Sequence, residues 1–238
     1  MGNLVHNLDS NLEVALLGEC VSTRNLLSYG VKVIREGAFI DTTQDPILTM
    51  LSIGIEKLHK LALGAIELER SGAWPDKSTM TGYGHGTLAM HETLMAQLRE
   101  QATDQSEYVN GLLSAVSEDR VIPPLLGALD TYGRAGRFYC LDILASAPQD
   151  WVGPDIAWTA IETAAQVDDD ISRLRDEYFE NLGNDARWEV FLAALNERIA
   201  TSVETAWDAI VGCGKNHMMG RAGEVIGFEA DRTATGRQ

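Results

Sequence analysis

The sequence predicts an all-α protein, built as a bundle of about seven helices. Apolar residues recur every three to four positions along most of the chain, which is the spacing of amphipathic helices. No alternating run of β-branched residues long enough for a confident strand is present. Proline and glycine stand between the periodic segments, where helices end. Each expected helix can therefore be placed between its breakers.

The expected helices follow in chain order. The first runs from Leu12 to about Gly37, and the second opens at Asp45-Pro46, because proline suits the first helical turn. The segment 72–75 ends the second helix, and a glycine-rich loop is expected over 76–86. The remaining five helices are expected at 87–101, 106–116, 123–147, 156–182 and 186–211.

These breaks predict two domains. Residues 1–147 would form the main bundle and 148–227 a C-terminal helical extension, because prolines and a glycine interrupt the pattern over 148–154. Residues 228–238 are rich in threonine, glycine and arginine and are expected to form a disordered tail.

Composition and charge restrict the class of protein. Apolar residues make up 45% and charged residues 23%, as in soluble globular proteins. The net charge of -16 repels nucleic acid and anionic membranes, so contact with RNA would need a local basic site. Neither a membrane span nor a secretory signal is expected. Three distant cysteines without a C-x-x-C pair favour reduced thiols and a cytoplasmic location.

A cluster of polar side chains lies in the second helix, in the stretch SIGIEKLHK (52–60). On a helical wheel, four of them lie opposite the apolar stripe: Glu56, Lys57, His59 and Lys60. The simplest interpretation is a solvated face with a Glu56–Lys60 ion pair, worth about 0.3 kcal/mol. Leu63 and Gly64 also fall in this arc, which indicates that another segment covers part of it.

Metal chemistry finds little support in the sequence. Glu56 and His59 match the Glu-x-x-His pair of di-iron bundles, but the chain lacks the second pair that such a site needs. His91-Glu92 lacks the second histidine of a zinc protease, because Met95 occupies that position. We therefore expect neither a metal nor another cofactor, and a metal-dependent bundle enzyme stays a minor alternative.

Arginines and aromatic residues gather in the stretch YGRAGRFYCLD (132–142). Arg134 and Arg137 can hold an anion while an aromatic ring stacks on a base. Gly133 and Gly136 weaken a helix by up to about 1 kcal/mol each, which is reasonable where a ligand or another helix approaches closely. The alternative is a tight helix crossing, with the arginines paired to some of the many acidic residues.

Three segments, taken in this order, resemble a known family. They are SIGIEKLHKLALGAIE (52–67), AWPDKSTMTGYGHGTL (73–88) and YGRAGRFYCLD (132–142). Over residues 20–145 the chain resembles the HEPN superfamily (higher eukaryotes and prokaryotes nucleotide-binding). There, a Ser-x-Gly-x-Glu-like helix precedes a loop with lysine and a Gly-His turn, and an arginine-bearing helix follows. The resemblance implies a homodimeric helical protein that binds nucleotide, RNA or a partner protein in a defence or stress system.

The resemblance also implies a polar site. Its members would be Glu56, Lys57, Lys60, His85, Arg134 and Arg137. Lys60 and the two arginines would hold phosphate, and Glu56 would orient a base or an arginine. Many HEPN proteins are metal-independent ribonucleases in which four to six residues separate an arginine from a following histidine. Here Cys140 follows Arg134 at such a separation.

Two functional hypotheses follow. If the protein cleaves RNA, Arg134 would stabilise the phosphorane and His85 would transfer protons, because the usual histidine is missing. The alternative is a non-catalytic interaction or regulatory module, which the acidic charge and the missing Arg/His pair both favour.

Overall fold

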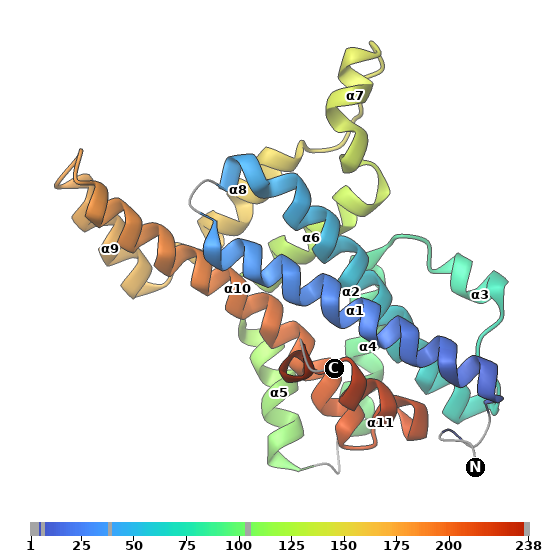
Figure 1. Cartoon of the computed structure of the whole chain (residues 1–238). Helices are drawn as coiled ribbons and strands as arrows, with labels where there is room; N and C mark the ends of the chain where they lie inside the picture. Colours follow the sequence, from blue (N-terminus) through green and yellow to red (C-terminus); the bar gives the residue numbers. More distant parts are fainter. Residues whose placement is uncertain (1–4, 6–7, 38–39, 103–105, 236–238) are drawn as a thin grey trace.

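The computed structural model describes residues 5, 8–37, 40–102 and 106–235, which are all-α and contain no strand (Figure 1). The predicted fold class is therefore confirmed, but the described residues form eleven α-helices rather than about seven. The first six are α1 (Ser10–Glu36), α2 (Ile40–Ser71), α3 (Lys77–Gly82), α4 (Thr87–Gln101), α5 (Glu107–Glu118) and α6 (Ile122–Arg134). The others are α7 (Tyr139–Leu144), α8 (Pro154–Ala165), α9 (Asp169–Phe179), α10 (Asp185–Lys215) and α11 (Gly220–Glu229).

The additional helices come from breaks and extensions that apolar spacing does not reveal. The expected fifth helix ends at Arg134, because the backbone leaves the helical region at Ala135, and α7 begins after a short 3-10 turn. The expected sixth helix is broken before α9 by the extended backbone of Asp168. α3 lies inside the expected glycine-rich loop, where the Asp76 carboxylate caps it, and α11 follows the last expected helix.

α1 and α2 pack against each other as an antiparallel pair, with two glycines fixing their register. A Cβ on Gly30 would lie 2.6 Å from Leu51 Cδ2, and a Cβ on Gly54 would lie 2.7 Å from Leu27 Cδ2. Each leucine therefore occupies the space that a side chain on the opposite helix would need. α2 begins earlier than expected, so Pro46 lies inside it rather than in its first turn.

α10 is a long helix through which the C-terminal helices contact the N-terminal part of the chain (Figure 1). It packs against α1, α5, α9 and α11, and α8 packs against α6. One cluster of buried apolar side chains includes residues of α1, α2, α6, α8 and α10. The helices on both sides of the predicted division at 148–154 thus contribute to one buried core.

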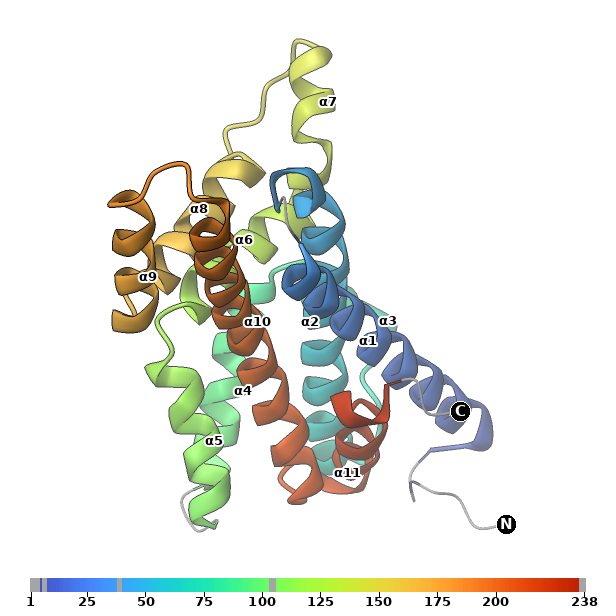
Figure 2. The same cartoon turned by 60° about the vertical axis from the view of Figure 1, so that its left-hand side comes forward.

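Two segments differ in how firmly they are joined to this core. In both views α7 projects from the rest of the molecule, and its residues are largely exposed (Figures 1 and 2). The expected tail is helical as far as Glu229, and Trp207 Nε1 donates a hydrogen bond to Ala230 O at 2.8 Å. Residues 228–235 therefore have defined contacts, whereas 236–238 lie outside the described residues.

Candidate functional site

Glu56 connects two basic side chains at the middle of α2. Its Oε1 accepts a hydrogen bond from Lys60 Nζ at 2.8 Å, and its Oε2 lies 2.9 Å from His85 Nδ1. Burial raises the pKa of the Glu56 carboxyl, but the hydrogen bonds from Lys60 and His85 outweigh burial, so its pKa lies below the ordinary value. Glu56 is thus a carboxylate at neutral pH, and the expected Glu56–Lys60 ion pair is present.

The α3–α4 connection brings His85 to this carboxylate. The Trp74 indole packs on Gly64 of α2, where a Cβ would lie 2.6 Å from Cζ2 of the ring. After α3 the chain turns at Gly84, whose φ of +57° lies in the left-handed region that glycine tolerates. α4 begins directly after this turn, so His85 is fixed between two helices while its side chain stays 57% exposed.

Arg134, at the C-terminal end of α6, lies against the same turn. A Cβ on Gly86 would lie 2.7 Å from Arg134 Nη2, so the guanidinium is next to the residue that follows His85. Asp130 holds it there, because its Oδ2 accepts from Arg134 Nε at 2.8 Å and its Oδ1 accepts from Leu88 N at 3.2 Å. The α4 N-terminus and the C-terminal end of α6 are joined through this carboxylate.

Of the remaining expected site residues, Arg137 stays near this cluster and Lys57 does not. Arg137 Nη2 donates to Gly133 O at 2.8 Å, and Gly133 lies against His85, because a Cβ on it would lie 4.0 Å from His85 Cβ. Lys57 Nζ lies 2.7 Å from Glu19 Oε2 on α1, and it therefore points to another side of α2. Cys140, at the separation from Arg134 that a histidine would occupy, is exposed on α7.

A buried histidine pair lies beneath the exposed cluster. His59 is only 1% exposed, and its Nε2 lies 3.2 Å from Nδ1 of His91 on α4. Burial, and then the neighbouring His91, lower the pKa of His59 well below its ordinary value. The expectation that His59 lies on a solvated face is wrong, because α4 covers this part of α2. Leu63 and Gly64 lie in the same arc of α2, and these nonpolar residues are the feature of the sequence that predicts a covering segment.

The cluster has the groups needed to bind an anion and to move a proton. Two of its cationic side chains are paired with carboxylates, Lys60 with Glu56 and Arg134 with Asp130, and Arg137 has no carboxylate partner among the described residues. If His85 Nδ1 donates to Glu56, the exposed Nε2 is free to accept a proton. The carboxylate would fix this tautomer and the orientation of the ring.

No protein-family model, curated protein or solved structure matches this chain. Within the described part of the chain, no helix is both long and apolar enough to span a membrane. The same residues contain no group of three histidine, cysteine, aspartate or glutamate side chains arranged to hold a metal ion. The resemblance to HEPN proteins therefore stays a prediction from the sequence.

Proposed function

We propose that the protein is HEPN-like and binds a phosphate ester, in a nucleotide or RNA, at the cluster around Glu56. One observation supports this most: a single carboxylate joins Lys60 to His85, while Arg134 lies beside the same turn. Cationic side chains that lie close together can bind a phosphate even when the net charge of the protein is -16. Arg134 would bind the phosphate with its remaining N–H groups, since Asp130 accepts from Nε and more weakly from Nη2.

The catalytic form of this proposal is metal-independent cleavage of RNA. His85 Nε2 would take the proton from a ribose 2′-hydroxyl, whose oxygen would then attack the neighbouring phosphorus. Arg134 would stabilise the negative charge of the phosphorane, and the protonated His85 or water would supply a proton to the leaving 5′-oxygen. Glu56 would act as a positioning residue, because it contacts His85 rather than the reacting atoms.

The test is incubation of purified protein with labelled RNA, with binding followed by anisotropy and cleavage by gel. Arg134→Ala is expected to weaken binding by about tenfold or more, because a hydrogen bond to a charged group is lost. Arg173→Ala is the matched control, since Arg173 also pairs with acids of its own helix, α9, and is exposed. Equal binding by all three proteins would rule out the site.

His85→Ala separates catalysis from binding. It should abolish cleavage but reduce affinity less than Arg134→Ala, because the proposal gives His85 the proton transfer and Arg134 the main contact with the phosphate. Cleavage that survives in His85→Ala would contradict the catalytic form and leave only the binding proposal.

Exposed apolar side chains favour a second candidate function, a non-catalytic interaction module that contacts a partner protein or a second copy. One group of them lies in and around α7: Phe138, Leu141, Ile143, Leu144, Trp151, Val152 and Ile156. Surfaces of this kind often mark protein contacts. Light scattering after gel filtration tests the homodimer: Leu144→Asp should shift a dimer to monomer, and an unchanged mass would exclude α7 as the contact.

A further inference from the structure

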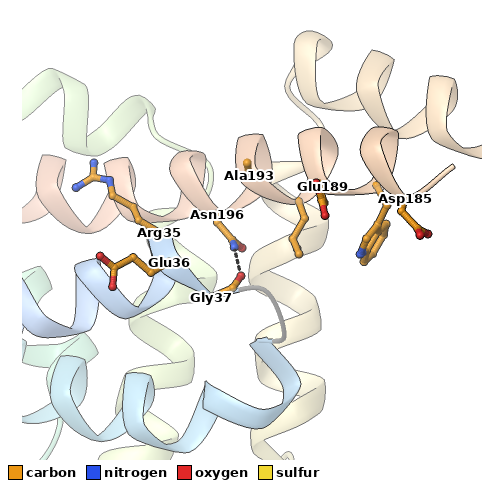
Figure 3. A pocket seen from close by; sticks show the side chains of 9 residues that line it. Arg35, Glu36, Gly37, Asp185, Glu189, Ala193 and Asn196 are labelled. Atoms are coloured by element: carbon orange, nitrogen blue, oxygen red, sulfur yellow. Dashed lines mark hydrogen bonds between the residues drawn. The ribbon is translucent and has the colours of Figure 1, made fainter.

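A pocket that shares no residue with the cluster around Glu56 lies between the C-terminal end of α1 and the N-terminal half of α10 (Figure 3). Its volume of about 560 Å³ is sufficient for a small organic molecule. Asn196 and Gly37 lie at its inner end, and Asp185 and Glu189 lie along α10 away from them (Figure 3). The proposed function assigns no role to this pocket.

Asn196 presents an unused hydrogen-bond acceptor at this inner end. The residue is 2% exposed, and its Nδ2 donates to Gly37 O at 2.9 Å. Its Oδ1 is buried and has no hydrogen-bond partner. Buried acceptors of this kind are normally satisfied, so a bound group with an N–H or O–H would complete the contacts of this side chain.

The charges around the pocket select a cation. Among the described residues, the Asp185 and Glu189 carboxylates that line it have no ion-pair partner. Arg35 also lines the pocket, but its guanidinium is bound by both Glu197 and Glu204, at 2.7 to 2.9 Å, on the other side of Asn196 (Figure 3). The C-terminal end of α1 adds the negative end of a helix dipole.

Trp188 supplies an aromatic surface in the same pocket. The residue is 39% exposed, and its ring packs against the rings of Tyr178 and Phe191, with centroids 5.0 and 5.7 Å away. A held indole is the preferred aromatic partner of a cation. Leu192, which also lines the pocket, offers a contact for an alkyl chain.

We propose that this pocket binds an alkylammonium group. The ammonium lies against the Trp188 indole, where Asp185 and Glu189 attract its charge. The alkyl chain lies along Leu192, and an N–H group at the other end of the ligand donates to Asn196 Oδ1. The same chemistry occurs in free polyamines and in lysine side chains, so the experiment includes a probe for each source.

Isothermal titration calorimetry of the full chain at low salt tests the proposal. The probes are 1,4-diaminobutane, Nα-acetyl-lysine methylamide and the uncharged 1,4-butanediol. One site per chain is expected for at least one of the two amines, and the diol should bind at least about tenfold more weakly. Tighter binding of the diamine points to a free polyamine, and tighter binding of the lysine derivative to a protein side chain.

Variants distinguish a defined pocket from general attraction to an acidic protein. Asp185→Asn with Glu189→Gln should weaken amine binding by about tenfold, whereas Glu107→Gln with Glu118→Gln removes the same charge elsewhere and should change it by less than about twofold. Trp188→Leu should weaken binding several-fold. Equal weakening by both pairs of substitutions, equal binding of the diol, or no amine binding at about 10 mM would each overturn the proposal.

Discussion

The buried His59–His91 pair predicts that the fold loses stability when the pH falls from 7.5 to 4.5. Burial, and then Arg99, lower the pKa of His91 to about 4 from an ordinary value of 6.5. The unfolded chain therefore takes up a proton below pH 6.5, while folded His91 does so only near pH 4. The stabilising contribution is complete above pH 6.5 and is lost progressively as the pH falls toward 4.

The size of this loss follows from the same two pKa values. Their difference corresponds to about 3 kcal/mol for His91 alone. His59 changes stability in the same direction, because its pKa is also lowered. A loss of this size is a large part of the 5–15 kcal/mol that typically separates folded from unfolded domains.

Urea unfolding followed by circular dichroism at pH 7.5, 6.5, 5.5 and 4.5 measures the effect. His91→Gln removes the titrating group and keeps a hydrogen-bonding side chain. Its free energy of unfolding should therefore fall by about 2.5 kcal/mol less than that of the wild type, because the range ends above the folded pKa of about 4. His217→Asn is the control, because His217 is exposed. A wild-type protein that loses less than about 1 kcal/mol between pH 6.5 and 4.5 would refute the reasoning.

Three further predictions concern the packing. Asp119→Ala removes the carboxylate that lies 2.8 Å from the Arg198 guanidinium, and should lower the free energy of unfolding in urea by about 3 kcal/mol. Replacing both partners, Asp119→Leu with Arg198→Met, should lower it less, because no unpaired charge is left. A larger loss in the double variant than in Asp119→Ala would contradict this prediction. Gly227→Ala places a Cβ 2.6 Å from Lys215 N of α10 and should lower the free energy of unfolding by about 2 kcal/mol. Gly111→Ala meets nothing within 4 Å and should raise it by up to about 1 kcal/mol, because alanine favours the helix. Equal melting temperatures of the two variants would contradict this prediction. Gly64→Ala displaces the Trp74 indole, so the tryptophan fluorescence should shift to the red. If the proposed site is correct, the affinity for RNA should also fall several-fold. An unchanged fluorescence spectrum would show that the ring does not pack on Gly64.

The sequence predicts helices well where their ends are local, and poorly where tertiary contacts set them. The third expected helix, 87–101, coincides with α4, because a glycine turn precedes it. The break between α8 and α9 was missed, since apolar spacing continues across it. No separate helix was expected at α11, because three glycines interrupt its apolar spacing within the predicted C-terminal extension; one of them, Gly227, allows close packing on α10.

The candidate site could be predicted only in part, for a similar reason. A helical wheel places Lys57 and Lys60 in one polar arc, but it cannot show that α1 lies beside Lys57 or that α4 covers His59. The approach of Arg134 to the turn at His85 joins residues 49 positions apart, and no local pattern encodes that distance. The residue types in the cluster follow from the sequence, whereas their arrangement follows from packing.

The paired glycines of α1 and α2 have a consequence for how this chain can change in length. Gly54, which receives Leu27, is only two residues from Glu56. One residue inserted between them would turn the rest of α2 by about 100° relative to α1. Glu56 would then leave His85 although every polar residue remained in the chain. Insertions and deletions should therefore be tolerated in the exposed segment 144–152 and selected against between 54 and 60.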